Sequence, residues 1–473
     1  MPHTVQQLPA PPRVPALTLV RADINFARSI IEPQRRAIDP TMTNHRRFRA
    51  WRSGLAAAMI ALAAGLGTQA RPAEAQGLSF IRDTEIEQLL NDYAQPIFRA
   101  AGLGTGRITM RIIRHESFNA FVLDGRNVFI HTGSLLASET PNQVIGVIAH
   151  EAGHISNAHL SDLRSKIAAD PTRGFLSQFL FVGVLLGQMR GNELVADQAG
   201  LRYLNATKQS ARGMIEIFER FAQEESFSLQ RTPQSLFARS HPFAADRINQ
   251  IRPTAQASPN WNTRDPAPLQ LRHDMMRAKI SGYLDRPQIV FNRYPQTDQS
   301  LPARYGRAIG MYFQSGIERA MPLVDALIKE QPNNPYFHEI KADFLMRSGR
   351  PREAVPIMRR AAQLAGANAP LISVRLAQAM ISAEDNSNLD EIISLARKSL
   401  IQDPNPQAYR ILANAFYKQD RLPEADLATA EALFLEGDLK QAQIFAKRAQ
   451  PRLKNGSPNW IRAGDIVNFK IPG

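Results

Sequence analysis

The chain has 473 residues, a formal net charge of +14 and no cysteine. Without thiols it can form neither a disulfide nor a thiolate metal site, so any bound metal must be held by histidine and carboxylate side chains. No basic stripe with interleaved aromatic residues runs along the sequence, and this gives no reason to expect nucleic acid as a partner.

A secretory signal peptide is the first predicted element, at residues 42–75. Basic residues at 45–52 precede an apolar stretch at 55–67, and Ala73-Glu74-Ala75 has the A-x-A form of a cleavage site. An apolar stretch this short does not make a stable membrane anchor, so we predict cleavage after Ala75 and export. An uncleaved amphipathic anchor is the alternative.

Residues 1–41 are rich in proline, lack periodicity and precede this signal. We expect Met42 to be the true start and residues 1–41 to be a non-native extension. Residues 1–75 contribute 10 of the basic and 4 of the acidic residues, so the remaining chain carries a net charge of +8. A charge of that size, spread over about 400 residues, permits peripheral contact with an anionic membrane surface.

A small sheet is predicted ahead of the central motif. Residues 84–100 have the spacing of an amphipathic helix, 108–113 read as a strand, and 121–123 and 128–130 form a hairpin through Asp124-Gly125. The edge of such a sheet can pair with an extended polypeptide, although a hairpin alone is more often structural.

The most informative motif is His150-Glu151-Ala152-Gly153-His154. On a helix, positions i and i+4 lie on one face a single turn apart, so both imidazoles can reach one metal ion. Glu151 is offset from that pair and can hold a water against the metal as general base. The motif therefore predicts metal-dependent hydrolysis with one Zn²⁺ per chain.

The helix that carries this motif is predicted to be buried. Thr140 is a candidate N-cap, Pro141 takes the first helical position and Gln143 can close a capping box. Apolar residues between 144 and 148 lead into the motif, which argues against the alternative of a solvated helix with two unrelated histidines. Buried histidines need partners, and a metal ion is one such partner.

A third metal ligand must come from another segment. The pattern with a third His six residues beyond His154 fails, because Leu160 stands there and His159 is one residue off that position. Glu193 and Asp197 lie i and i+4 on a second predicted helix, so one can bind zinc while the other accepts an N–H from a ligand histidine. Glu193 is the better candidate for the metal.

The interval between the two motifs holds residues 161–190, with an apolar run at 175–186. These twelve residues are too few to cross a bilayer, which needs roughly 20. We expect this segment to pack against the peptidase core, and contact with a membrane or with substrate is the alternative.

Beyond a Pro-rich linker at residues 252–266 the sequence becomes helical with a recurring period. Pro335, Pro370 and Pro406 open successive units 35 and 36 residues apart, close to the roughly 34-residue tetratricopeptide repeat. Residues 267–473 are thus predicted to form stacked helix pairs, whose groove suits extended peptides or partner proteins. An ordinary helical bundle is the alternative.

Taken together, the motifs resemble those of the gluzincin peptidases in the HtpX and CAAX-prenyl-protease superfamily. The resemblance rests on HEAGH followed by ELVAD, on Asn119-Ala120-Phe121 upstream and on Ser240-His241-Pro242 with Arg247 downstream. It spans about residues 86–251 and implies an α+β zincin (gluzincin) domain with a small β-sheet at residues 78–251. An all-α tetratricopeptide-repeat solenoid would follow.

This resemblance implies the ligand set of the metal. His150, His154 and Glu193 would hold the zinc ion, and Asp197 would support a ligand histidine from behind. The interval at 161–190 is shorter than in many relatives, which puts a gating function of that segment in doubt.

The same resemblance implies how substrate would be held. Asn119, with Ala120 and Phe121, would hold the substrate main chain, and Arg247 would steady the developing oxyanion. His241 would either assist there or occupy the open metal position at rest. Considered without the resemblance, His241 before a proline is equally a structural loop histidine.

The signal, the peptidase motifs and the repeats together resemble the periplasmic β-barrel assembly-enhancing proteases of Gram-negative bacteria. This implies a zinc endopeptidase, with Glu151 as the base, in periplasmic quality control of unfolded or misassembled outer-membrane proteins. Polypeptide substrates and the outer-membrane β-barrel assembly machinery are the implied partners. The alternatives are a chaperone or adaptor whose metal site stays mostly latent, and an exopeptidase, which would need a pocket for a terminal amine.

Overall fold

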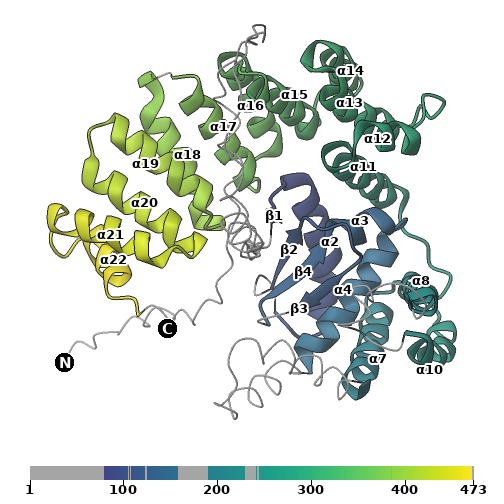
Figure 1. The fold of residues 1–473 in the computed structure, drawn as a ribbon. Helices are drawn as coiled ribbons and strands as arrows, with labels where there is room; N and C mark the ends of the chain where they lie inside the picture. The colour runs from purple at the N-terminus through teal and green to yellow at the C-terminus, as the bar shows by residue number, and fades with distance from the viewer. Residues whose placement is uncertain are drawn as a thin grey trace, which may run out of the picture. The chain divides into compact units, whose positions relative to one another are not determined.

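The structure, a computed structural model, describes residues 79–157, 190–228, 241 and 244–470, apart from 105, 107, 123, 124 and 385 (Figure 1). The predicted extension at 1–41, the predicted signal peptide, His159 and nearly all of the 161–190 segment lie outside the described residues. Within the described part, no helix combines the length and the apolar character needed to cross a membrane.

One mixed sheet is built from four short strands: β1 (Phe80–Ile81), β2 (Thr109–Ile113), β3 (Ala120–Val122) and β4 (Asn127–His131). Their order is β1-β2-β4-β3, with β2 and β4 parallel and the other two pairs antiparallel. The predicted hairpin is thus confirmed as β3 and β4, and β3 forms one edge of the sheet (Figure 1).

The register of β3 turns the backbone groups of Ala120 and Val122 away from β4. The Asn119 carbonyl accepts the His131 N–H at 2.9 Å, and Ala120 lies opposite Ile130. Hydrogen-bonded and non-hydrogen-bonded pairs alternate along an antiparallel ladder. The N–H and C=O of Ala120 therefore point away from β4, toward the open side of the sheet.

The two predicted helices around the sheet are confirmed. Helix α2 (Thr84–Ala100) has the predicted bounds, and α4 (Pro141–Ser156) starts behind Thr140, whose hydroxyl accepts the Gln143 N–H at 3.4 Å. The Gln143 side chain accepts the Glu139 N–H at 2.7 Å, so the second half of the predicted capping box is displaced by one residue. Buried apolar side chains join α2, α4 and the sheet into one core: Leu89, Tyr93, Ile97, Val128, Ile130, Val144 and Ile148.

Further helices surround α4: α3 (Thr132–Ala137), α7 (Arg190–Ala206), α8 (Arg212–Ser228) and α10 (Ala244–Gln256). Both α7 and α8 pack directly on α4. A β-carbon on Gly153 would lie 2.6 Å from the Ala196 carbonyl oxygen of α7, which is closer than real contacts allow. The crossing of α4 and α7 therefore requires glycine inside the HEAGH motif.

The predicted linker at 252–266 begins inside a helix, which corrects its first boundary. Helix α10 continues to Gln256 although it contains Pro253. Ile251 and Ala255 are each 1% exposed and belong to the peptidase core. Their packing outweighs the hydrogen bond that a proline removes from a helix.

The rest of the described chain is helical. The helices are α11 (Ala267–Leu284), α12 (Pro287–Arg293), α13 (Leu301–Ser315), α14 (Ile317–Glu330), α15 (Pro335–Arg347), α16 (Pro351–Ala365), α17 (Pro370–Ser382), α18 (Leu389–Gln402), α19 (Pro406–Lys418), α20 (Leu422–Glu436), α21 (Leu439–Ala449) and α22 (Pro458–Val467).

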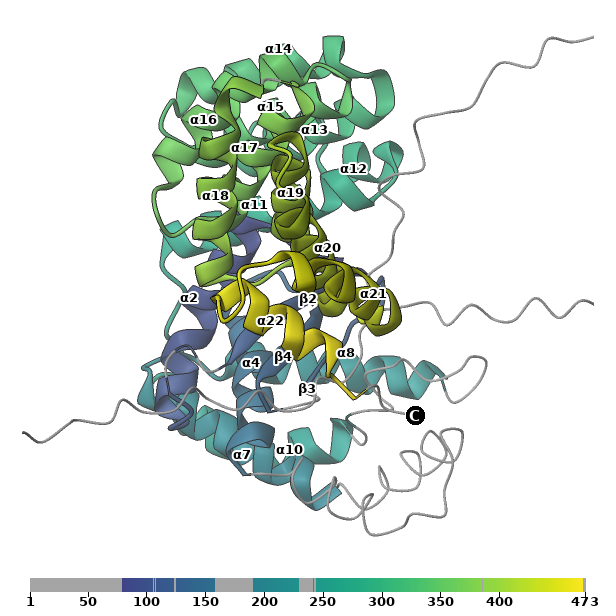
Figure 2. The ribbon, with the colours of Figure 1, turned by 90° about the vertical axis from the view of Figure 1, so that its left-hand side faces the viewer.

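The predicted repeat spacing is confirmed by the starts of these helices. Pro335, Pro370 and Pro406 are the first residues of α15, α17 and α19, and each of these helices packs on the next helix in the chain. Figure 2 shows the successive pairs from α13 to α18 stacked side by side. Proline suits the first helical position because its missing N–H would have no partner there.

Candidate metal centre

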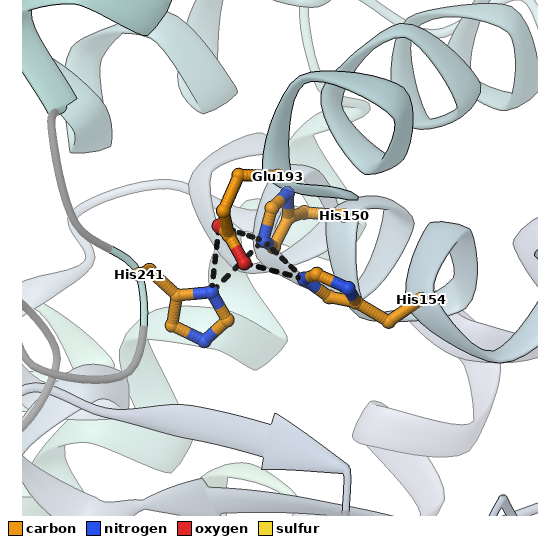
Figure 3. Close-up of side chains that lie close together, drawn as sticks. All are labelled: His150, His154, Glu193 and His241. Carbon is orange, nitrogen blue, oxygen red and sulfur yellow. Dashed lines mark hydrogen bonds and ion pairs between the residues drawn. The ribbon is translucent and has the colours of Figure 1, made fainter. Parts of the chain in front are cut away.

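Four side chains from three segments point toward one another (Figure 3). Each of His150, His154, Glu193 and His241 offers one ligand atom, and these atoms all lie within 4.8 Å of one another. All four residues are buried. The cluster joins the two motifs that the sequence predicted to meet, together with His241.

The helices account for this convergence. His150 and His154 lie one turn apart on α4 and therefore share a face. Glu193 lies in the first turn of α7, which crosses α4 at Gly153. His241 comes from the segment between α8 and α10 and approaches from the opposite side, as Figure 3 shows.

Four of the distances between donor atoms are close to those between the ligands of a tetrahedral metal ion. The Nε2 atom of His150 lies 3.1 Å from His154 Nε2 and 3.1 Å from His241 Nδ1. Glu193 Oε1 lies 3.2 Å from His154 Nε2, and Glu193 Oε2 lies 3.0 Å from His241 Nδ1. Ligand bonds of about 2 Å in a tetrahedron place the ligand atoms about 3.3 Å apart. Ring nitrogens and a carboxylate are ligands that Zn²⁺ accepts, so these residues fit that ion.

Glu151 is close to this cluster without being one of the four ligand candidates. Its side chain is 1% exposed, and its Oε1 atom has no hydrogen-bond partner among the described residues. That oxygen lies 3.5 Å from His241 Nε2. A buried carboxylate oxygen without a donor is costly, and it is suited to accept a proton from a water molecule at the cluster.

Asp197 fixes the orientation of His150. The Nδ1 atom of His150 lies 2.7 Å from Asp197 Oδ1, so this nitrogen carries the proton and Nε2 is free for a metal. Of the two carboxylates one turn apart on α7, Glu193 thus offers a ligand atom and Asp197 takes the supporting position. The sequence analysis assigned the same two positions to Glu193 and Asp197, and these roles stay predictions.

Arg247 binds both of these carboxylates. Its Nε and one terminal nitrogen donate to the two oxygens of Asp197, each at 2.7 Å, and its other terminal nitrogen lies 2.8 Å from Glu193 Oε2. The guanidinium also lies 4.8 Å from the ring centre of Phe218. These contacts favour a role in positioning the ligands, whereas the sequence resemblance implied contact with an oxyanion.

Charge and burial act against each other in this centre. Burial raises the pKa of Glu193, but the charges of His241 and His154 outweigh it and hold the pKa of this carboxyl well below its usual value. Burial also raises the pKa of Asp197, and Arg247 reverses the shift to a net lowering. Burial lowers the pKa of His150, yet the hydrogen bond and charge of Asp197 raise it to about 9. A metal ion at Nε2 competes with that proton.

The predicted substrate strand lies beside the centre. The Ala120 carbonyl, which faces the open edge of β3, lies 3.2 Å from His241 Nε2. The Asn119 N–H donates to Ser134 Oγ at 2.7 Å, and the Phe121 ring stacks on Phe129 at 5.3 Å. Ala120 is therefore adjacent to the metal cluster, whereas the contacts of Phe121 lie on the other face of the sheet.

Sequence reasoning missed Phe218 and the double role of Arg247. The ring of Phe218 packs edge-on against His150 at 5.6 Å, which together with Arg247 encloses the cluster from the side of α8. The sequence around Phe218 does not indicate which partner its side chain packs against.

Residues 81–255 match Peptidase family M48, and this range contains every residue of the cluster. The Beta-barrel assembly-enhancing protease of Yersinia pestis is 24% identical over 414 residues, which are 81% of this chain and 82% of that protein. The protein of the same name from Escherichia coli (strain K12) is 23% identical over 412 residues with the same two shares.

Two more distant similarities cover parts of the chain. The Mitochondrial metalloendopeptidase OMA1 of Schizosaccharomyces pombe is 28% identical over 167 residues, 33% of this chain and 49% of that protein. Among solved structures, MamA MSR-1 C2 covers 35% of this chain and 93% of its own at 17% identity with a TM-score of 0.29. A likeness at that score carries no argument about the fold.

Proposed function

We propose that the chain is a metallopeptidase that carries out zinc-dependent endopeptide hydrolysis, because residues 81–255 match Peptidase family M48 and the two long relatives are named as proteases. His150, His154 and Glu193 hold the zinc ion in this proposal. The observation that carries it is the convergence of four buried ligand atoms within 4.8 Å of one another, with the like ring nitrogens of His150 and His154 only 3.1 Å apart.

Glu151 is the proposed base. Zinc bound at the cluster would polarise the scissile carbonyl and make a water molecule more acidic. Glu151 takes the proton of that water through its unpaired Oε1 and later gives it to the leaving amine. Asp197 holds His150 in the tautomer that presents Nε2, and Arg247 holds Asp197 and Glu193 in place.

His241 is proposed to occupy the fourth donor position at rest. Its Nδ1 atom lies among the donor atoms, and its Nε2 atom faces the Ala120 carbonyl at 3.2 Å. An extended substrate that adds to the edge of β3 needs the same carbonyl as a hydrogen-bond acceptor. In this proposal a polypeptide that pairs with β3 therefore displaces His241 from both the carbonyl and the cluster.

The proposed substrates are unfolded or misassembled outer-membrane proteins in the periplasm. The names of the two long relatives connect those proteins with β-barrel assembly. A polypeptide that forms β-strands suits the open edge of β3, and the stacked helix pairs of residues 267–473 can dock the client or the outer-membrane assembly machinery. The zincin fold, the cleaved signal peptide and a repeat domain at 267–473 belong to the same proposal.

The first test combines metal analysis with a cleavage assay. We expect the purified chain to hold one Zn²⁺ and to cleave casein, and we expect a chelator to stop cleavage until zinc is restored. Blocked peptides without free termini should also be cleaved, because no terminal amine is needed. Cleavage that persists after complete zinc removal would contradict the proposal.

A chaperone or adaptor is the second candidate, because His241 lies inside the donor cluster. The two functions separate in a comparison of wild type with His241→Ala. Faster proteolysis by the variant supports a gated peptidase. Inertness of both proteins, together with suppressed aggregation of an unfolded client, supports the chaperone.

A further inference from the structure

Three side chains of α11 bind the backbone just ahead of the metal helix. Gln270 donates to the Glu139 carbonyl at 3.0 Å, and His273 Nε2 lies 2.9 Å from the Ser138 carbonyl. The Arg277 guanidinium donates to the Leu136 carbonyl through two nitrogens, each at 3.2 Å. Positions 270, 273 and 277 share one face of a helix, so this face of α11 hydrogen-bonds to the backbone carbonyls of residues 136–139.

Residues 136–139 lead directly into α4. Helix α3 ends at Ala137, Thr140 caps the next helix, and α4 starts at Pro141. Asp265, two residues before α11, also accepts the Asn142 N–H at 3.0 Å. The first turn of the helix that carries His150 and His154 is therefore held by residues that follow the peptidase region in the chain.

His273 is the central residue of this contact. It is fully buried, and its Nδ1 atom lies 3.1 Å from the Tyr93 hydroxyl of α2. A carbonyl can only accept, so Nε2 carries the proton and Nδ1 accepts from Tyr93. Burial lowers the pKa of His273 to about 4, which keeps the ring neutral with one donor and one acceptor.

The remaining faces of α11 connect it to both halves of the molecule. Met276 and Ile280 belong to the peptidase core, whereas Met275 and Ala278 belong to the core of the first helix pair beyond it. Lys279 lies 3.3 Å from Glu339 of α15. Helix α11 thus packs on α3, α2 and α4 and at the same time on α13, and Figure 1 shows α11 beside α3.

We propose that Gln270, His273 and Arg277 are positioning residues that set the place of the metal helix from the repeat region. The repeat region is then a part of the catalytic apparatus, and not an adaptor tethered beside it. A client that binds the helices packed on α11 is in continuous contact with α4 through this clamp. The kinetic consequence rests on the proposed peptidase function, whereas the structural consequence does not.

The test compares His273→Leu with His273→Gln in the full chain. Leucine removes the donor and the acceptor, whereas glutamine keeps one of each. For His273→Leu we expect hydrogen exchange of residues 136–149 to be faster by about tenfold, because local opening costs less. We expect kcat on a short blocked peptide to fall by about tenfold with KM nearly unchanged, since the ligands are misplaced while the substrate edge is intact.

Arg272→Ala is the matched control, because Arg272 also lies on α11 and pairs with Asp92 at the surface without touching residues 136–139. Near-wild-type values for the control and for His273→Gln support the clamp. Equal values for His273→Leu and the control overturn it, as does faster exchange throughout α19 and α20, which would indicate general destabilisation. If His273→Leu does not fold, Arg277→Ala takes its place in the same comparison.

The outcome for the clamp is separable from the outcome for the proposed function. If the wild-type chain cleaves nothing, the peptidase proposal fails, while hydrogen exchange in α4 still tests the clamp. If wild type cleaves and the exchange of α4 is the same in His273→Leu and in the control, the clamp fails and the peptidase proposal stands.

Discussion

Two clusters of buried ionisable side chains occur in the described part of the molecule, and their chemistry differs. At the junction of α2 with α11 and α15, the Lys279 ammonium lies 2.8 Å from Asp83, 3.2 Å from Glu85 and 3.3 Å from Glu339. Arg375 also lies 3.2 Å from Glu339, and the Tyr305 hydroxyl donates to Glu85 at 3.0 Å. Attraction between opposite charges holds such a cluster together.

The metal centre contains contacts of another kind. His150 Nε2 faces ring nitrogens of His154 and His241 at 3.1 Å each, so like atoms converge on one point. Protons cannot satisfy all of these nitrogens at once, whereas one cation can. Burial of charge is common to both clusters, so convergence of acceptor atoms is the feature that distinguishes the candidate metal site.

The largest expected effect concerns Glu151. Glu151→Gln should keep the zinc, because Glu151 is not among the four ligand candidates, and should lower kcat by roughly 10³-fold, because the amide cannot take a proton. Metal analysis together with peptide cleavage checks both halves. Wild-type cleavage by this variant would remove Glu151 from the mechanism.

Substitution of Lys279 at the junction of α2 with α11 and α15 should lower the stability of the fold without changing metal binding. Lys279→Met leaves three carboxylates without their common cation, and we expect the free energy of unfolding to fall by about 3–5 kcal/mol. Denaturant titration measures the loss, and zinc content of the folded variant should stay at the wild-type value.

A surface pair serves as the control for that experiment. Lys341 pairs with Asp325, whose side chain is 50% exposed, and Lys341→Met should cost less than about 1 kcal/mol. Similar losses for both lysine variants would show that burial adds nothing to the Lys279 cluster.

The lowered pKa of His273 should make the stability of the fold depend on pH. Its pKa of about 4 in the folded chain lies below the usual value of 6.5, so the unfolded chain binds the proton more tightly between these values. The contribution of neutral His273 to the free energy of unfolding is therefore complete above pH 6.5. It decreases as pH falls toward 4, by about 3 kcal/mol at most.

Denaturation midpoints at pH 7 and pH 4.5 test this window. His273→Gln cannot titrate and should lose less stability between the two values than wild type. Burial and the neighbouring His115 lower the pKa of His131 to about 4. His131 therefore contributes to the loss of stability with falling pH in both proteins. Identical pH profiles for variant and wild type would contradict the assignment to His273.

The smallest expected effect concerns the start of the metal helix. Thr140→Ala removes the hydroxyl that accepts the Gln143 N–H at 3.4 Å, and we expect a loss of about 0.5–1 kcal/mol. Thr140→Ser should restore most of it in the same denaturation assay. A loss as large as that of Lys279→Met would mean that Thr140 has a role beyond capping.

The sequence predicted what depends on neighbours along the chain. The bounds of α2, the cap of α4 and the proline starts of α15, α17 and α19 all follow from local preferences. The meeting of the two α4 histidines with Glu193 was also predictable, because each motif fixes the face of its own helix.

Contacts between distant segments were not predictable in the same way. Nothing in the sequence around Arg247 indicates that its side chain binds Asp197 and Glu193, which lie 50 and 54 residues earlier in the chain. The grip of His273 on Ser138 joins residues 135 positions apart. Such contacts depend on how helices are placed in space, and a local pattern carries no information about that placement.

The absence of a side chain at Gly153 has a consequence for the geometry of the site. Gly153 contributes no atom to the chemistry, yet any larger residue would push against the Ala196 carbonyl, three residues beyond Glu193. The close approach of α4 and α7 at Gly153 thereby sets the distance between the Glu193 carboxylate and the imidazoles of His150 and His154. A substitution at Gly153 would therefore change the separation of α4 and α7, and with it the metal affinity, without changing any ligand residue.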